Sequence, residues 1–156
     1  MYNRPLDINN PGALRTTSDN WQGKTGDYNG FVIFSKPEYG YRAMFKNLYS
    51  YFQYGYNTVS KIISTWGKVG VDDIQSYINF VCKMTGFSPD QKLKVDEATF
   101  KALAKAITVQ ENGVVADLNQ LNKGYSMAFI TVTTKQIEYG GAGLLIGAGL
   151  LWLIFK

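Results

Sequence analysis

From residue 36 onward, apolar residues recur every three or four positions in several stretches of the chain. This spacing places them on one face of a helix and predicts amphipathic helices that pack around a shared core. The first stretch follows Ser35-Lys36-Pro37-Glu38, which has the S-x-x-E pattern of a capping box, with proline in the first helical turn. Its apolar positions are Tyr41, Met44, Phe45, Leu48 and Phe52.

Further helices are predicted where a capping residue precedes an apolar stripe. Thr58 can cap a helix over 59–66, and Asp72 or Asp73 can cap one that runs through Met84, before Gly86. Asp96 can cap a helix over 97–112, with Asn112-Gly113 as its stop signal. A short fifth helix is expected over 117–128.

The first 30 residues have a different character, because glycine, proline and asparagine punctuate them closely. Phe31–Phe34 is a short apolar run that directly follows Asn29-Gly30, a turn signal of hairpins. A small hairpin is therefore expected here. The predicted fold class is α+β, with a small β-containing lobe followed by a helical lobe.

The end of the chain carries seventeen uncharged and mostly apolar residues, 139–155, followed by Lys156. A bilayer core about 30 Å thick needs roughly 20 apolar helical residues, with about 17 as the lower limit. The segment predicts a single C-terminal transmembrane helix, and a buried core helix is the alternative. We expect one domain over 1–128, a connector over 129–138 and a membrane anchor over 139–155. No signal peptide is recognised at the start, so we expect a tail-anchored protein.

Composition excludes several kinds of chemistry. The chain has a net charge of +4 and no histidine, which rules out histidine-based acid–base catalysis and His-rich metal sites. We expect no metal and no cofactor. Cys82, the single cysteine, is predicted to be a small core residue. Since no run of basic residues stands out, nucleic acid is not an expected partner.

Glu111 is the first candidate for acid–base chemistry. It extends the stripe formed by Phe100, Ala104 and Ile107, and it lies in the last helical turn, where the helix dipole disfavours negative charge. Burial and the dipole would both raise the pKa of its carboxyl group, as a general acid for glycoside cleavage requires. The residues alone leave a second interpretation open, in which Glu111 turns out to solvent at a frayed helix end.

Other carboxylates and aromatic residues are weaker candidates. Glu38 is the alternative catalytic residue, although the capping box would explain it and would favour a low pKa. A second carboxylate could come from the loop-rich lobe, and nothing in the sequence decides between Asp7, Asp19 and Asp27. The aromatic side chains that could stack on sugars near the junction of the lobes are Trp21, Tyr28, Tyr39 and Tyr41.

Several blocks together resemble phage virion proteins of the lysozyme-like, peptidoglycan-cleaving kind. The typical pattern is NNPGNIR, then WQG, then two phenylalanines and a G-x-R-A segment, then a T-V-x-x-I-I-x-x-W helix and finally H-E-N-G. The matching blocks here are Asn9-Asn10-Pro11-Gly12-Ala13-Leu14-Arg15, Trp21-Gln22-Gly23, 31–34, 37–43, 58–66 and Gln110-Glu111-Asn112-Gly113. They run in order from about residue 7 to 128 and include no part of the apolar tail. Ala13 and Gln110 depart from the pattern.

These blocks are also similar to the lytic transglycosylase and glucosaminidase branch of the lysozyme superfamily, with the order of segments circularly permuted. The resemblance implies a lysozyme-like fold and gives the catalytic role to Glu111. It gives Asn9, Asn10 and Arg15 a role in lining the cleft. The aromatic residues expected to bind substrate beside them are Trp21, Tyr39 and Tyr41.

The resulting hypothesis is a membrane-anchored virion enzyme that cleaves the MurNAc–GlcNAc strands of peptidoglycan. A lytic transglycosylase is favoured over a muramidase or glucosaminidase, because it needs one acid and no second carboxylate is evident. The expected partners are peptidoglycan, a lipid bilayer contacted by 139–155, and other virion proteins. We expect a single-pass protein of the virion, at an internal or vertex-associated membrane. The alternative is a non-enzymatic glycan-binding or structural membrane protein of the virion.

Overall fold

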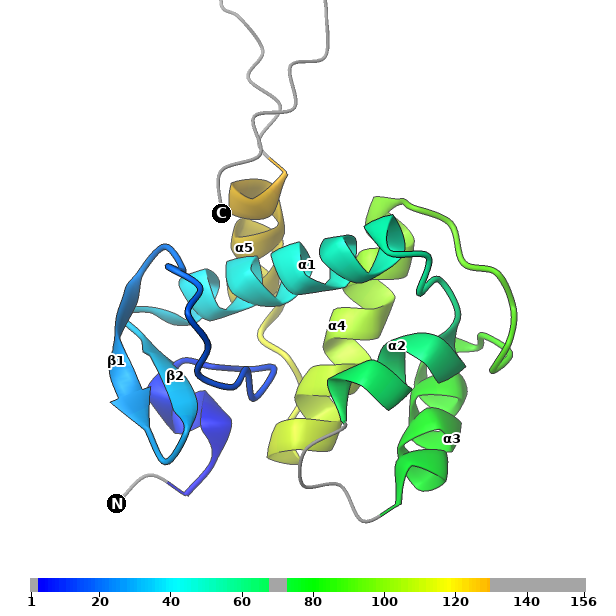
Figure 1. Cartoon of the computed structure of the whole chain (residues 1–156), viewed down its shortest axis with the longest axis horizontal. Coiled ribbons are helices and arrows are strands. Elements are labelled where there is room, and N and C mark those ends of the chain that lie inside the picture. Colours follow the sequence, from blue (N-terminus) through cyan, green and yellow to red (C-terminus); the bar gives the residue numbers. More distant parts are fainter. Residues whose placement is uncertain (1–2, 68–72, 130–156) are drawn as a thin grey trace, which may run out of the picture.

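The computed structural model describes residues 3–67 and 73–129, which form a mostly helical α+β fold (Figure 1). A two-stranded hairpin and a short 3₁₀ helix lie on one side, α2, α3 and α4 lie on the other, and α1 runs across between them. The elements are η1 (Pro5–Ile8), β1 (Lys24–Tyr28), β2 (Phe31–Phe34), α1 (Pro37–Gln53), α2 (Val59–Trp66), α3 (Ile74–Thr85), α4 (Glu97–Asn112) and α5 (Leu118–Ala128). The α+β prediction is confirmed.

The predicted membrane span over 139–155, and the connector apart from Phe129, lie outside the described residues. Among the helices that the structure does describe, none has the length and apolar character needed to cross a membrane.

The hairpin is antiparallel, as predicted, with Tyr28 paired to Phe31 across the turn. Asn29 and Gly30 both have positive φ, 51° and 79°, which matches the twist that two-residue hairpin turns require. In β2, Val32 and Phe34 are buried while their neighbours are only partly buried. This alternation places one face of the hairpin against the rest of the molecule.

Side-chain caps begin four of the five helices in the described part of the chain. Thr58, Asp73, Asp96 and Asp117 each accept hydrogen bonds from backbone N–H groups of the first turn. These N–H groups have no partner inside the helix, so the caps stabilise each start. The helices predicted from the capping signals and the apolar stripes are confirmed, with the third starting after Asp73.

The predicted capping box at the start of α1 is wrong. The N-cap is Lys36, whose side chain makes no capping bond. The backbone N–H of Ser35 instead donates to the Gly23 carbonyl at 2.9 Å. This N–H is therefore not available to the Glu38 carboxylate, as the capping box would require. The Glu38 carboxylate accepts a hydrogen bond from Lys123 Nζ at 2.9 Å, which links α1 to α5.

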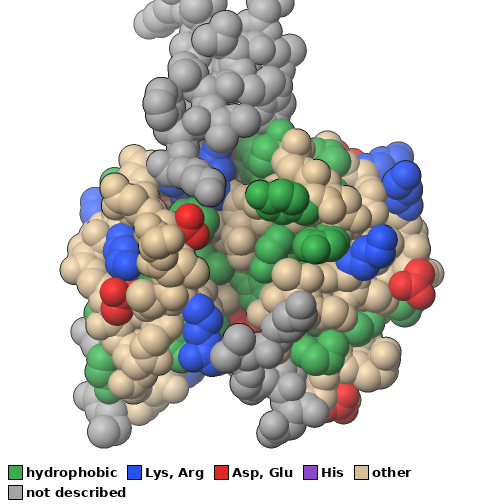
Figure 2. Space-filling model, in the orientation of Figure 1, with side chains coloured by type: hydrophobic (Ala, Val, Ile, Leu, Met, Phe, Trp, Pro, Cys, Tyr) green, Lys and Arg blue, Asp and Glu red, His purple; other side chains and the backbone are tan. Residues whose placement is uncertain are grey.

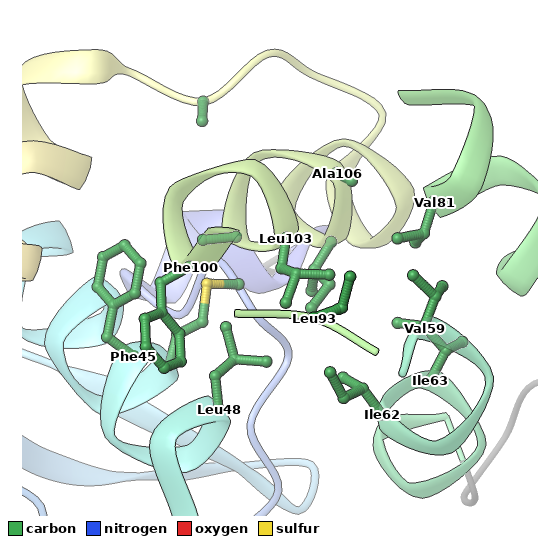
Figure 3. Close-up of a cluster of buried hydrophobic side chains, with 14 of the residues drawn as sticks. Phe45, Leu48, Val59, Ile62, Ile63, Val81, Leu93, Phe100, Leu103 and Ala106 are labelled. Carbon is green, nitrogen blue, oxygen red and sulfur yellow. The ribbon is translucent and has the colours of Figure 1, made fainter. Parts of the chain in front are cut away.

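The main core lies between α1, α2, α3 and α4, and Figure 3 shows side chains from all four meeting there. Phe45 and Leu48 come from α1, and Phe100 and Leu103 come from α4. Cys82 is partly buried against this core, close to its predicted role. A second, smaller cluster joins the hairpin to α1 and consists of Leu14, Val32, Phe34 and Ala43.

α5 packs closely on α1 at Gly124. A Cβ atom there would lie 2.4 Å from Tyr41 Cβ and 2.9 Å from the Glu38 carbonyl oxygen. Only glycine lets the two helices approach this closely, since any side chain would push them apart. The Glu38–Lys123 ion pair lies beside this contact.

Asn112, the last residue of α4, ties the N-terminal segment to this helix end. Its Oδ1 accepts from Leu6 N at 2.7 Å, and its Nδ2 donates to the carbonyl oxygens of Pro11 at 2.8 Å and Thr108 at 3.0 Å. The residue is only 6% exposed, so water cannot readily replace these bonds.

Asn112→Ala should therefore destabilise the fold strongly. The substitution leaves the Leu6 N–H and the Pro11 carbonyl without a partner, and we expect a loss of about 2–4 kcal/mol in the free energy of unfolding. Urea denaturation checks this against Asn122→Ala, an exposed position on α5. Equal stabilities of the two variants would show that the Asn112 amide does not hold the segment in place.

Candidate functional site

A cleft with a volume of about 350 Å³ lies between the N-terminal loop and the helices. Figure 2 shows hydrophobic side chains gathered along the middle of this face, between the hairpin side and the helical side. The described lining residues come from the loop before β1, the start of β2, α1, α2 and the end of α4. They are Gly12, Ala13, Leu14, Arg15, Thr17, Asp19, Trp21, Phe31, Asn47, Tyr51, Thr65, Trp66, Gly67 and Glu111.

Glu111 enters this cleft from the last turn of α4. The helix ends at Asn112, and the next residue, Gly113, has the left-handed conformation that glycine favours just after a helix C-terminus. The bonds of the neighbouring Asn112 fix this turn against the N-terminal segment. Glu111 is partly buried. The sequence correctly predicted its helix and its position in the last turn of that helix.

The environment of Glu111 favours the neutral acid. Burial raises the pKa of its carboxyl above the ordinary value, and this effect outweighs two opposing ones. The Tyr77 hydroxyl on α3 donates to Glu111 Oε1 at 2.8 Å, and the positive charge of Arg15 also favours the carboxylate; both lower the pKa. The net pKa is raised, as a proton donor at neutral pH requires.

Tyr77 is a partner that the sequence did not indicate as part of the site. It is only 1% exposed, and burial is the largest cause of the raised pKa of its own hydroxyl. Its apolar neighbours on α3 had marked it only as a core position. The contact joins residues 34 positions apart, so no local signal in the sequence could reveal it.

The wall on the helical side of the cleft is aromatic. Trp66 donates from Nε1 to the Gly12 carbonyl at 3.1 Å, and its ring stands edge-on to Tyr51 with centroids 6.1 Å apart. A Cβ at Gly12 would lie 2.8 Å from the Trp66 ring and 2.9 Å from Met44 Cε, so glycine is needed for this packing. Flat aromatic faces of this kind suit the apolar faces of sugar rings.

Asp19 brings a second carboxylate to the same cleft. The Thr17 hydroxyl donates to Asp19 Oδ2 at 2.9 Å, and the Asp19 backbone N–H donates to the same hydroxyl oxygen at 3.2 Å. Of the three aspartates that the sequence left open, Asp7 pairs with Arg4 and Asp27 pairs with Lys24, and neither lines the cleft. The structure therefore singles out Asp19.

Arg15 and Trp21, two of the residues expected to bind substrate, line the cleft together with Glu111. The Arg15 guanidinium carbon lies 4.2 Å from the centre of the Phe31 ring, a cation–π contact between the loop and the hairpin. Tyr51, Thr65 and Trp66 also line it; Thr65 and Trp66 belong to the 58–66 block noted in the sequence, whereas Tyr51 belongs to no such block.

The structure assigns Asn9 and Asn10 a role different from lining the cleft. Asn10 is fully buried; its Nδ2 donates to the carbonyls of Leu14 and Val32, both at 2.9 Å, and its Oδ1 accepts from Leu14 N at 2.8 Å. Asn9 donates from Nδ2 to the Phe34 carbonyl at 2.8 Å. These amides hold the N-terminal loop against β2, and neither residue is among those that line the cleft.

Tyr39, Tyr41 and Glu38 also lie outside the cleft lining. Tyr41 is fully buried in the main core, and the Tyr39 ring packs over Gly23, where a Cβ would lie 2.3 Å from it. The pKa of Glu38 is lowered, chiefly by the hydrogen bond from Lys123. The low pKa expected of Glu38 is present, but it arises from an ion pair between helices.

Within residues 3–67 and 73–129, no three His, Cys, Asp or Glu side chains lie close enough together to hold a metal ion. The chemistry that this part of the chain offers is that of two carboxyl groups, a guanidinium group and aromatic faces in one cleft.

No model of a known protein family matches this chain. The chain is similar to Protein P5 of Pseudoalteromonas phage PM2, with 31% identity over 133 residues. The match covers 81% of this chain and 82% of that protein, so it includes most of both sequences. Identity at this level over most of both chains indicates common descent. The chain therefore belongs to the same family of phage proteins as Protein P5 of Pseudoalteromonas phage PM2.

Proposed function

We propose that this chain is a phage virion enzyme that cleaves the glycan strands of bacterial peptidoglycan, with Glu111 as the general acid. The observation that carries the proposal is the position of Glu111 in an aromatic cleft, where burial raises the pKa of its carboxyl. A protonated carboxyl group next to the leaving oxygen is the central requirement of glycoside cleavage.

In the proposed reaction, the Glu111 proton moves to the oxygen between two sugars, and the bond from this oxygen to the anomeric carbon breaks. Positive charge then develops on the sugar ring. In a lytic transglycosylase, the 6-hydroxyl of the same sugar attacks the anomeric carbon and returns its proton to the Glu111 carboxylate. The product carries a 1,6-anhydro ring, and the acid is restored without a water molecule.

Asp19 bears on the choice between this route and hydrolysis. Its carboxylate lies in the same cleft and can stabilise the positive charge on the ring, or, in a hydrolase, serve as a base or nucleophile. The transglycosylase route remains our proposal, because it needs one group that changes protonation and Glu111 fits that role. Asp19 would then act through its charge alone.

The proposal also places the protein in the virion. Family membership with a phage protein supports this location, and the apolar segment 139–155 supports attachment to a lipid bilayer. An anchored enzyme would open the cell wall from a virion with an internal membrane. Other virion proteins are then expected neighbours.

A non-enzymatic glycan-binding protein of the virion is the second candidate. The Tyr77 hydrogen bond favours it, because a buried hydroxyl needs an acceptor and Glu111 supplies one. Under this interpretation the aromatic cleft binds a glycan strand, and Glu111 only completes the packing of α3 on α4.

Glu111→Gln separates the two candidates. We expect activity on purified sacculi to fall at least about a hundredfold, which is the lower end of what a general acid contributes. The melting temperature should stay equal or rise, because the amide can still accept from Tyr77 and no charge is buried. Release of soluble glycan fragments and thermal unfolding provide the two measurements.

Glu97→Gln is the matched control, since it makes the same chemical change at the exposed start of the same helix.

The pH dependence of stability adds a check on the state of Glu111. Because the pKa of Glu111 is raised in the folded state, its contribution to stability is present at low pH and is lost as pH rises through that pKa. The stability of Glu111→Gln should not show this loss. Retained activity with reduced stability would instead identify Glu111 as a structural partner of Tyr77.

Asp19→Asn tests the second carboxylate. Loss of a negative charge beside the developing positive charge should lower activity at least about tenfold. Asp90→Asn, in an exposed loop, controls for the change in net charge.

Mass spectrometry of the glycan products released by the wild-type protein is expected to show anhydro ends. Reducing ends would refute the transglycosylase route and make Asp19 part of a hydrolase.

Glu38→Gln should leave most of the lytic activity, because this side chain does not line the cleft. The variant loses the ion pair with Lys123, and because the Lys123 side chain is 65% exposed, water screens this pair and it is only weakly stabilising. We expect the melting temperature to fall by no more than about 4 °C. Complete inactivation of a folded Glu38→Gln protein would transfer the catalytic role to Glu38.

A further inference from the structure

Arg42, on α1 beside its contact with α5, is a buried cation. The residue is only 9% exposed, and its Nε atom is buried without a hydrogen-bond partner. α5 lies directly against it, since a Cβ at Gly124 would come within 3.0 Å of the Arg42 backbone nitrogen. Arginine is almost never buried to this degree unless it is paired, because an arginine stem that packs on apolar neighbours normally leaves the charged head in water. Burial of this guanidinium group therefore calls for an anion.

Lys46 adds a second positive charge one turn later on the same face of α1. It is partly buried, and burial and the nearby charge of Arg42 both lower the pKa of its ammonium group. Its Nζ lies 6.0 Å from the centre of the Phe129 ring, which is the outer limit of a cation–π contact. Two like charges on neighbouring turns of a helix destabilise it, so the fold alone gives no reason for this pair.

The pair has no counter-ion in the described part of the chain. Within residues 3–67 and 73–129, no carboxylate forms an ion pair with Arg42 or Lys46. Glu38, one turn before Arg42, pairs with Lys123 at 2.9 Å, and the hydrogen bond from Lys123 is the largest cause of its lowered pKa. The nearest carboxylate on α1 thus compensates a different cation.

We propose that Arg42 and Lys46 bind a phosphate group, which is supplied by the headgroup of a phospholipid. The inference rests on the part of the proposed function that attaches the chain to a bilayer through 139–155. A guanidinium group can donate two parallel N–H bonds to phosphate oxygens, and an ammonium group beside it adds a point charge. Basic pockets next to membrane spans recognise lipid headgroups in this way.

The position of the site favours a lipid over a free phosphate ion. Phe129, beside Lys46, is the last described residue, and the nine residues 130–138 separate it from the apolar segment 139–155. Nine residues span at most about 30 Å, so a membrane anchor at 139–155 keeps the bilayer surface within reach of this end of α5. The Phe129 ring also contacts the Tyr125 ring, with centroids 4.8 Å apart. Aromatic rings beside cations are typical of residues at a membrane surface.

A lipid bound at this site also determines which way the cleft faces. In Figure 1, α5 ends at the top of the molecule, whereas the end of α4 that contributes to the cleft lies at the bottom. With Arg42 and Lys46 against the bilayer, Glu111 at that end of α4 lies on the side away from the membrane. The cleft is then presented to the cell wall.

Lipid binding to the full chain in a non-ionic detergent tests the inference, with bound molecules counted by native mass spectrometry. The probes are phosphatidylglycerol, a diacylglycerol with the same acyl chains and no phosphate, and inorganic phosphate. We expect Arg42→Met to weaken binding of phosphatidylglycerol at least about tenfold, the size of a charge-assisted hydrogen bond. Binding of the diacylglycerol should change less than twofold. Inorganic phosphate should bind the wild-type chain at least about tenfold more weakly than phosphatidylglycerol, because the acyl chains add apolar contacts.

Further variants separate the charge, the shape and the structural role of the group. Lys46→Met should also weaken binding of phosphatidylglycerol, whereas Lys105→Met, at an exposed position on α4, should leave it unchanged. Arg42→Lys should recover part of the affinity that Arg42→Met loses. Without lipid, the melting temperature of Arg42→Met should be equal to that of the wild type or higher, because a buried charge without a counter-ion is removed.

Three results would overturn the inference: equal weakening of phosphatidylglycerol and diacylglycerol by Arg42→Met, inorganic phosphate that binds as tightly as the lipid, or a less stable Arg42→Met protein with unchanged lipid affinity. Failure of the proposed function has a different signature. In that case the wild-type chain cleaves no sacculi, or it does not float with phospholipid vesicles, whatever the affinities of the Arg42 variants.

Discussion

The side-chain amide of Asn112 is the contact on which the cleft depends. It joins the end of α4 to Leu6 and Pro11, and these residues lie more than 100 positions earlier in the chain. The loop that follows Pro11 carries Arg15, Asp19 and Trp21, whereas the residue before Asn112 is Glu111. One buried amide therefore sets the distance between the wall that carries the charges and the helix turn that carries the acid. Asn10 extends this arrangement to the hairpin through its bonds to Leu14 and Val32.

The Tyr77–Glu111 hydrogen bond is compatible with both protonation states of the proposed acid. Tyr77 donates to Oε1, and a neutral carboxyl can keep its proton on Oε2 while Oε1 still accepts. The bond does favour the carboxylate, as its effect on the pKa shows, but burial outweighs it. The carboxyl is thus held in one orientation while burial keeps its pKa above the ordinary value. A carboxyl that must return to the same position after giving up a proton needs this property.

The sequence predicted the helices well, because each has a local signal: a capping residue, an apolar stripe and, for α3 and α4, a glycine at the end. The first strand of the expected hairpin, β1, had no signal of its own in the sequence, because Lys24–Tyr28 is mostly polar and forms a strand only by pairing with β2. The predicted capping box is wrong because of a contact that is also not local in the sequence: the Ser35 N–H donates to the Gly23 carbonyl. For the site, the helical stripe located Glu111. A motif cannot show whether a polar side chain hydrogen-bonds to the backbone or to a ligand. For this reason the resemblance gave Asn9 and Asn10 a role in lining the cleft, whereas their amides bond to backbone carbonyls.

The two departures from the phage pattern have separate physical meanings. Gln110 is exposed, and it is not among the residues that line the cleft, so the missing histidine removes nothing from the described site. Ala13 has a φ of 51°, a left-handed conformation that costs alanine roughly 1–2 kcal/mol and that asparagine adopts more readily. The asparagine typical of this position thus satisfies the turn between Gly12 and Leu14. Its replacement by alanine strains the loop that holds Arg15 and leaves the two carboxyl groups of the cleft in place.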